Sequence, residues 1–337
     1  MTDLRDQNSD MIVVLPLGAH EQHGPHLPFE TDTIIAEGIV ARVSDALPAE
    51  LNVNFLPAQP VGYSIEHMDT EGTQSLAFAE AVNQWIGIGE NLHAGGIRKL
   101  VMLNAHGGNS PLMTIVATEL RTRLDMLAVA TSWTRFGLPE GLITPEEKAL
   151  DIHGGFIETS VMLALRPDLV DMSKARNFSN AQSRYAEEFK FLRAYGPHAF
   201  GWKMHDLNPE GVAGNAAAAT AEAGEKLIAN AVSGFIELLR DVDRFDLDRF
   251  KSQRLANQAD MVKQRCVFLL NMAIHRIKSR AGHQQLNLAV LQDPRAFVAQ
   301  QAGINWHHDR ANFCQPEPAK EKLRAVIQMQ GDLIAFA

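Results

Sequence analysis

Short apolar runs alternate with longer helical patterns in the first half of this 337-residue chain. Four runs have the length and apolar character of buried strands, and they are Met11–Leu17, Asn52–Pro57, Lys99–Leu103 and Met126–Thr131. Because helical segments separate them, their order predicts an α/β fold with a mainly parallel sheet. Such a sheet is covered by helices on both faces.

Helical periodicity marks the segments between and after these runs. Stripes of apolar residues begin near Thr33 and continue through residues 75–94, Leu112–Leu124 and a segment that contains Glu158–Leu165. The pair Gly95-Gly96 is a typical stop signal for the second of these helices. A later stripe from Ala219 to Arg240 predicts a packed helix that closes the domain.

The composition of the chain changes near residue 247. From Asp246 onward there are 13 basic and 8 acidic residues, although the whole chain has a net charge of −9. We therefore predict a main domain at residues 1–246 and a C-terminal helical extension of unknown role at 247–337. Apolar residues between Val267 and Ile277 favour a packed interface helix over a nucleic-acid arm in this extension.

Composition and charge argue against several classes of protein. The net charge of −9 disfavours nucleic acid as a partner, since a phosphate-backbone binder needs a basic surface. Met11–Leu17 is too short to span a membrane, and residues 1–10 lack the basic start of a signal peptide. The only cysteines, Cys266 and Cys314, fit a reducing compartment. We expect a cytoplasmic protein that binds neither nucleic acid nor membrane.

The highest density of metal-ligand side chains lies directly after the first predicted strand. Residues 18–28 read GAHEQHGPHLP, and Asp32 follows them. In an extended segment Glu21 and His23 point the same way, because side chains alternate with a period of two. Zinc and manganese accept this mixture of oxygen and nitrogen donors, and a further carboxylate can bridge two ions. The segment predicts a metal site built on Glu21, His23 and Asp32.

Each of these residues also has a structural explanation. Asp32 precedes a helix that is predicted to start near Thr33, where Asp is a common N-cap. His20, His23 and His26 lie beside two prolines and also fit hydrogen-bonded loop residues. Taken alone, capping is the favoured role for Asp32, whereas the density of histidines beside Glu21 favours metal ligands.

Two further polar clusters follow along the chain. Residues 104–110, NAHGGNS, come directly after the third strand and offer His106 as a ligand, although such glycine-rich turns are common. Residues 153–160, HGGFIETS, lead into a helix whose first turn Glu158 would cap in the structural alternative. His153 precedes that helix and suits a general acid or base. Because ligands of parallel sheets bind beyond the carboxyl ends of strands, we expect these stretches to converge.

The three clusters, in this order and at these separations, resemble the creatininase family of amidohydrolases. The run LPLGAHEQHGPHLPFETD, which starts at Leu15, is the most specific motif, and LNAHGGNS and HGGFIETS follow it. Two more segments agree with the family, one at Gly62–His67 followed by Gly72-Thr73 and one within Gly201–Val212. The resemblance covers roughly residues 11 to 240.

This resemblance implies a three-layer α/β/α fold with a two-metal centre, usually assembled as a homo-oligomer. The implied ligands are Glu21, His23, Asp32, His106 and Glu158. Asp32 is the implied bridge, and the resemblance leaves open which ion Glu21 and Glu158 each bind. The implied cofactors are two divalent ions of zinc, manganese or iron. His153 and Glu158 are the implied catalytic residues, with His153 as the proton donor.

The chain also departs from the family pattern. Gly108 stands where creatinine-hydrolysing members carry a glutamate, so creatinine itself is disfavoured as the substrate. Thr70-Glu71 replaces the Phe-Pro that many relatives have before Gly-Thr. The extension after about residue 247 has no counterpart in the pattern.

Together these features predict a metal-dependent amidohydrolase that acts on a small molecule. A hydroxide held between two ions would attack the carbonyl of a cyclic amide or formamide, and His153 would protonate the departing nitrogen. The alternatives are a peptidase-like maturation member of the family and a non-catalytic metal-binding regulatory protein. The intact ligand set favours an enzyme. Aromatic candidates for a pocket wall, although such residues are more often core, are Trp133, Phe136, Phe200 and Trp202.

Overall fold

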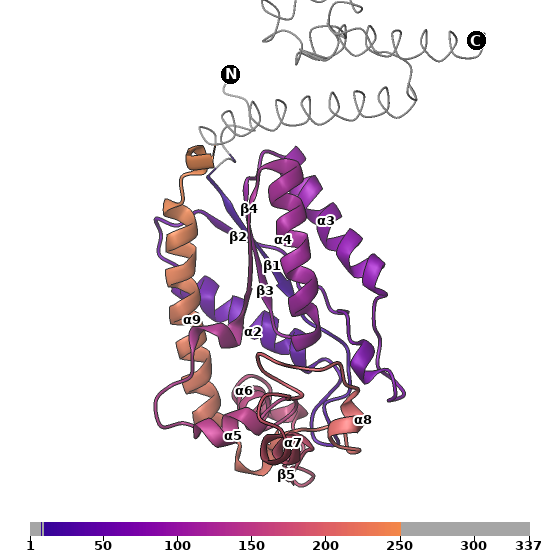
Figure 1. Cartoon of the computed structure of the whole chain (residues 1–337). Coiled ribbons are helices and arrows are strands. Elements are labelled where there is room, and N and C mark those ends of the chain that lie inside the picture. The colour runs from indigo at the N-terminus through magenta and orange to yellow at the C-terminus, as the bar shows by residue number, and fades with distance from the viewer. Residues whose placement is uncertain (1–7, 9, 251–337) are drawn as a thin grey trace, which may run out of the picture. The chain divides into compact units, whose positions relative to one another are not determined.

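A four-stranded sheet forms the centre of the computed structural model, which describes residue 8 and residues 10–250 (Figure 1). Its strands are β1 (Ile12–Leu17), β2 (Val53–Phe55), β3 (Lys99–Asn104) and β4 (Leu127–Ser132). The spatial order is β2-β1-β3-β4, and each neighbouring pair is parallel. The four predicted strands and their parallel arrangement are confirmed.

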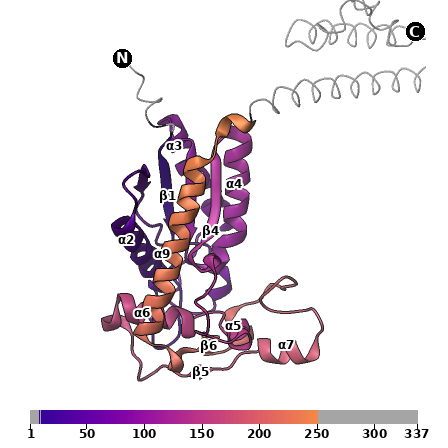
Figure 2. The same ribbon diagram turned by 90° about the vertical axis from the view of Figure 1, so that its left-hand side faces the viewer.

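Helices cover both faces of the sheet. They are α2 (Thr31–Ala46), α3 (Phe78–Ala94), α4 (Ser110–Leu124), α6 (Phe156–Leu165) and α9 (Ala221–Arg244). Figures 1 and 2 show α9 on one side of the strands and α3 with α4 on the other. This arrangement confirms the predicted three-layer α/β/α fold.

Alternation of side chains along β1 explains the two cores. Ile12 and Val14 point to the face where α2, α6 and α9 pack, whereas Val13 and Leu15 point to the face of α3 and α4. Every residue of β1 and β3 is buried, as expected for a parallel strand between two helical layers. The apolar runs in the sequence therefore identify these strands directly.

Short elements gather beyond the carboxyl ends of the strands, as Figures 1 and 2 show for α5 and α7. The helices there are α5 (Pro145–Leu150), α7 (Gln182–Glu188) and α8 (Met204–Leu207). A two-stranded antiparallel sheet joins β5 (Asn177–Phe178) to β6 (Gly214–Asn215). The described 3-10 helices are η1 (Ile65–His67), η2 (Gly107–Asn109), η3 (Trp133–Phe136), η4 (Pro167–Leu169), η5 (Ala216–Ala218) and η6 (Leu247–Phe250).

The first compact unit of the chain ends at Phe245. The predicted C-terminal extension, residues 247–337, lies outside the described residues from position 251 onward, and so does its apolar segment Val267–Ile277. Its helical character stays a prediction. None of the helices within the described part of the chain is long and apolar enough to cross a membrane.

Candidate metal centre

The structure brings all five predicted ligands together at the carboxyl end of the sheet. Glu21 and His23 lie in the loop after β1, and His106 follows β3. Asp32 and Glu158 lie in the first turns of α2 and α6. The side chain of Glu158 is 18% exposed, and those of the other four ligands are at most 4% exposed. Stretches that are far apart in sequence thus converge on one buried site, as expected from a parallel sheet.

A buried asparagine joins the loops that carry these residues. The side-chain oxygen of Asn109 accepts the backbone N–H of Tyr63 at 2.9 Å, and its amide nitrogen donates to the carbonyl of Gly18 at 3.0 Å. The same nitrogen donates to Oδ1 of Asn104, which also accepts the backbone N–H of His106. The loops after β1 and β3 and the segment before η1 are therefore held in a fixed relation.

One group of possible ligands comprises Glu21, Asp32 and His106. Nδ1 of His106 lies 3.1 Å from Oε1 of Glu21 and 3.5 Å from Oδ2 of Asp32. Its Nε2 lies 2.9 Å from the carbonyl oxygen of Tyr63. Because a carbonyl only accepts hydrogen bonds, Nε2 carries the proton in the neutral ring. The lone pair of Nδ1 then faces the two carboxylates.

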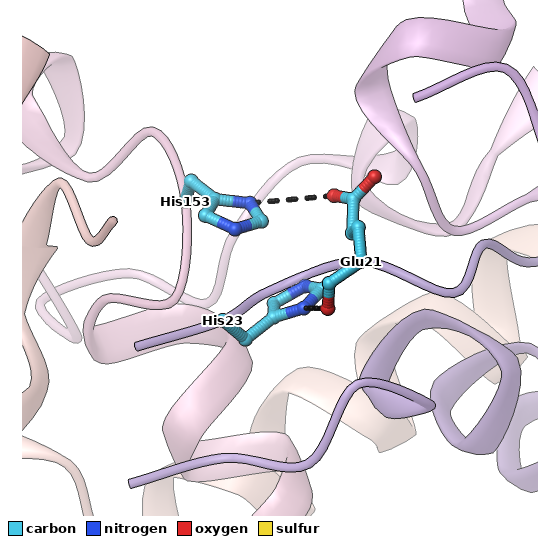
Figure 3. A group of neighbouring side chains, drawn as sticks. All are labelled: Glu21, His23 and His153. Carbon is cyan, nitrogen blue, oxygen red and sulfur yellow. Dashed lines mark hydrogen bonds and ion pairs between the residues drawn. The ribbon is translucent and has the colours of Figure 1, made fainter. Parts of the chain in front are cut away.

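A second group comprises His23, Asp32 and Glu158. Nε2 of His23 lies 3.4 Å from Oδ1 of Asp32 and 3.8 Å from Oε2 of Glu158. Nδ1 of His23 donates to the backbone carbonyl of Glu21 at 2.9 Å, as Figure 3 shows. The neutral ring therefore presents the lone pair of Nε2 to the carboxylates. Asp32 belongs to both groups and directs one oxygen to each histidine.

Several atoms at the centre of the site have no hydrogen-bond partner among the described residues. They are both carboxylate oxygens of Glu21, Oδ2 of Asp32 and Nε2 of His23. Buried polar atoms are nearly always hydrogen-bonded, so such a cluster needs an explanation. Carboxylate oxygens and imidazole nitrogens are donors that zinc and manganese accept. The residues present therefore fit divalent cations.

The pKa values show how strongly these groups interact with one another. Burial alone would lower the pKa of His23 and His106, but the surrounding carboxylates outweigh it and raise both to about 10. For Glu21 burial favours the neutral acid, yet the imidazoles hold its pKa well below its usual value. Burial raises the pKa of Glu158 to about 7. A divalent cation would replace the protons on these imidazoles and stabilise all the carboxylates in their charged form.

The capping alternative for Asp32 is wrong. Helix α2 begins at Thr31 with Glu30 as its N-cap, and no side chain caps it. Asp32 lies inside the first turn and points into the centre instead. Glu158 lies in the first turn of α6, where its Oε2 accepts the backbone N–H of Gly154 at 2.6 Å and also faces His23. The N-cap residue of α6 is Gly155, and the carboxylate of Asp151 accepts the first two backbone N–H groups of the helix, those of Phe156 and Ile157.

The ring of His153 faces the carboxylate of Glu21, as Figure 3 shows. Its Nε2 is 2.7 Å from the carbonyl oxygen of Gln22, and its Nδ1 is 3.6 Å from Oε1 of Glu21. The carbonyl fixes the proton on Nε2, so Nδ1 faces the site. Backbone hydrogen bonds between His153 and Ala213 hold this segment. The ring also belongs to a possible ligand group with Glu21 and His23.

Two neighbours of the site were not among the predicted site residues. His67 is 2% exposed, and its Nε2 lies 3.4 Å from Oε1 of Glu21. Its ring lies 4.3 Å from that of His153, and burial lowers its pKa to about 4. Glu66 lies beside His106. Both lie in the Gly62–His67 segment, whose agreement with the family pattern was the only signal for them in the sequence.

Other candidate residues lie outside the centre. His26 contacts the hydroxyl of Thr159 at 2.9 Å, and His20 stacks on Phe29, so the loop interpretation holds for these two histidines. Trp133 and Phe136 pack in the core beside α9. Phe200 and Trp202 pack in a small cluster with Met204.

Several named proteins are similar in sequence to this chain. The chain is 30% identical over 232 residues to the mycofactocin precursor peptide peptidase of Mycolicibacterium smegmatis, which covers 68% of this chain and 84% of that protein. It is 28% identical to creatinine amidohydrolase of Pseudomonas putida, with 69% and 90% covered. A 2-amino-5-formylamino-6-ribosylaminopyrimidin-4(3H)-one 5'-monophosphate deformylase of Methanobrevibacter ruminantium is 27% identical, with 53% and 69% covered.

Solved structures agree with the fold. A manganese creatininase superposes with a TM-score of 0.58 at 25% identity, covering 72% of this chain and 94% of that one. A creatininase variant of Zn-Zn type gives 0.56 at 26% identity over the same shares. The family model described as creatininase, creatinine amidohydrolase, matches residues 1–239. The chain therefore belongs to the creatininase family and is, as predicted, a hydrolase of the amidohydrolase class.

Proposed function

We propose that this chain hydrolyses an amide carbon–nitrogen bond with two divalent ions, held by Glu21, His23, Asp32, His106 and Glu158. The position of Asp32 carries the proposal. Its two oxygens face two different histidine nitrogens, at 3.4 Å and 3.5 Å, and in the neutral rings both nitrogens present lone pairs. This arrangement supports a bridging carboxylate with Glu21 and His106 on one ion and His23 and Glu158 on the other.

When bound, two such ions would supply Lewis acidity and would lower the pKa of water to about 7. The protein residues do the remaining work. The Gln22 carbonyl holds the proton of His153 on Nε2, so Nδ1 is free to take up a proton on the side of Glu21. His153 can then return that proton to the departing nitrogen, which makes it the general acid of the reaction. Burial of the centre keeps bulk water away from these charges.

For the substrate, the first candidate is a small non-peptide amide, either cyclic or a formamide. Relatives named for creatinine and for a formylamino-pyrimidine support this class. Creatinine itself is disfavoured because position 108, where family members that act on it carry a glutamate, is a glycine in this chain.

A peptide is the second candidate, since a relative named as a peptide peptidase shows 30% identity. A hydrolysis screen of cyclic amides, formamides and short peptides, with manganese, zinc or iron supplied, distinguishes these candidates. Turnover of peptides alone would overturn the small-molecule proposal.

Manganese and zinc are the first ions to test, because creatininase structures hold them. The setting we propose is cytoplasmic, supported by the presence of only two cysteines. A homo-oligomer is the proposed assembly, and light scattering of the purified chain tests it.

Metal content tests the proposed centre. Glu21→Ala and His106→Ala should each lose bound metal, because each removes a donor from a buried site. The matched control is Glu37→Ala, whose side chain is exposed on α2. Unchanged metal stoichiometry in both variants would contradict the proposed ligand set.

A further inference from the structure

The oxygens behind His106 form a second set of contacts on the far edge of its ring. Its Nε2 lies 2.9 Å from the carbonyl oxygen of Tyr63, 3.3 Å from the hydroxyl of Ser64 and 3.5 Å from Oε1 of Glu66. The opposite nitrogen, Nδ1, faces Glu21 and Asp32. The imidazole therefore lies between the carboxylates of the centre and a separate carboxylate on η1.

We propose that Glu66 is a positioning residue for metal binding at His106. Its carboxylate, together with the carbonyl of Tyr63, holds the proton on Nε2 and makes Nδ1 a stronger electron-pair donor. The inference rests on the proposed function, since it concerns the ion that His106 and Glu21 would share. Carboxylates placed in this way behind a metal-binding histidine fix the tautomer and orientation of the ring.

The space around Gly108 shows that this contact is built into the fold. A Cβ at position 108 would lie 2.4 Å from Nε2 of His106, 2.4 Å from the carbonyl oxygen of Tyr63 and 2.5 Å from Oε1 of Glu66. A Cβ essentially never comes this close to another heavy atom, so a side chain at 108 would displace the carbonyl of Tyr63 or the ring of His106 as well as the carboxylate of Glu66. Glycine at position 108 has no side chain, and this leaves the space in which the carboxylate of Glu66 lies beside His106.

The segment that carries Glu66 is itself fixed. The backbone N–H of Ser64 donates to the hydroxyl of Ser75, and the N–H of Leu76 donates to the carbonyl of Gly62. The side chain of Glu66 is only 16% exposed, so solvent screens its charge weakly. A charged acceptor strengthens a hydrogen bond more than a neutral one does. The hydrogen bond that Nε2–H donates is strengthened most by a charged acceptor when the imidazole is bound to a cation.

The test compares Glu66→Gln with Glu71→Gln, an exposed glutamate of the following loop. Calorimetric titration of the metal-free proteins with manganese gives the dissociation constants of both binding steps. We expect Glu66→Gln to weaken one step by about 10- to 100-fold and to leave the other within about threefold. The unfolding midpoint of the metal-free protein should not change, and Glu71→Gln should match the wild type.

Wild-type affinity at both steps in Glu66→Gln would overturn the inference, and so would equal weakening of both steps with a lower unfolding midpoint. Glu21→Ala, titrated in the same series, separates this failure from failure of the proposed function. If Glu21→Ala loses a manganese ion while Glu66→Gln binds normally, only the role of Glu66 is wrong. If Glu21→Ala binds both ions normally, the centre itself is wrong and the inference falls with it.

Discussion

Two regions of the molecule supply the candidate centre, and they hold their side chains in different ways. Glu21 and His106 follow neighbouring strands of one parallel sheet, whose register pairs Leu17 with Asn104. The region between residues 150 and 215 supplies His153 and Glu158 from irregular loops and a short helix. Its local clusters contain few large buried side chains, mainly Phe178, Met204 and Leu207.

This difference separates two tasks within the site. The strand-end region places fully buried donors, which suits the fixed geometry of metal ligands. In the second region Glu158 is 18% exposed, and Gly154 adopts a φ of +62° that few other residues tolerate. The more open side of the centre is therefore the side where proton transfer and substrate contact would take place. We expect changes in the two regions to have distinguishable effects.

The largest effect on the reaction is expected at His153. His153→Gln should lower kcat by about 10²- to 10⁴-fold, because the general acid is lost. Both ions should stay bound, since we assign His153 to proton transfer and not to metal binding. Rate measurements combined with metal analysis check this, and His198→Gln serves as an exposed control from the same region. Loss of an ion in His153→Gln would show that this histidine is a ligand.

In the strand-end region the largest effect on stability is expected at Asn109. Asn109→Ala leaves the partly buried backbone N–H of Tyr63 and the buried carbonyl of Gly18 without this partner. The free energy of unfolding should fall by about 3 kcal/mol, as expected for one buried and one partly buried polar group left unsatisfied. Denaturant titration of the metal-free protein measures it, with Asn91→Ala on the exposed face of α3 as the control. A loss no greater than in the control would mean that Asn109 does not fasten these loops.

A pH-dependent effect of similar size, present only at acidic pH, is expected at Asp151 in the second region. Burial raises its pKa to about 6, although the backbone N–H groups of Ile157 and Phe156 oppose the shift. The folded state therefore favours the protonated acid. Its stabilising contribution is complete below about pH 4 and is lost as the pH rises through 6.

Comparison with Asp151→Asn, which does not titrate, isolates this contribution. The free energy of unfolding of the wild type, relative to the variant, should fall by about 3 kcal/mol between pH 4 and pH 7. Denaturant titrations of both metal-free proteins at several pH values measure the difference. A difference that stays constant with pH would contradict the raised pKa.

The two regions also differ in what the sequence reveals. The strands β1 and β3 were predicted within one residue at each end, because helices bury both of their faces and leave continuous apolar runs. The parallel order then implied that the loops after Leu17 and Leu103 would meet. For Asp32 the sequence alone favoured capping, since the start of α2 could not be placed to within two residues.

The remaining neighbours of the centre depend on contacts between distant segments. His67 reaches Glu21, and Glu66 reaches His106, across 46 and 40 positions of the chain, and no local pattern encodes such contacts. The carboxylate of Asp151 accepts a backbone N–H at the start of α6. It lies in the space that side chains at positions 155 and 214 would occupy, and both of these residues are glycines. These roles arise from tertiary structure, so residue type and spacing do not predict them.

Anomalous diffraction from crystals grown with manganese would show directly whether Asp32 joins two ions. We expect two peaks, one beside Nδ1 of His106 and the carboxylate of Glu21, the other beside Nε2 of His23 and the carboxylate of Glu158. Asp32 should contact both ions, with one oxygen on each. A single peak, or two peaks that do not share Asp32, would contradict the two-metal centre.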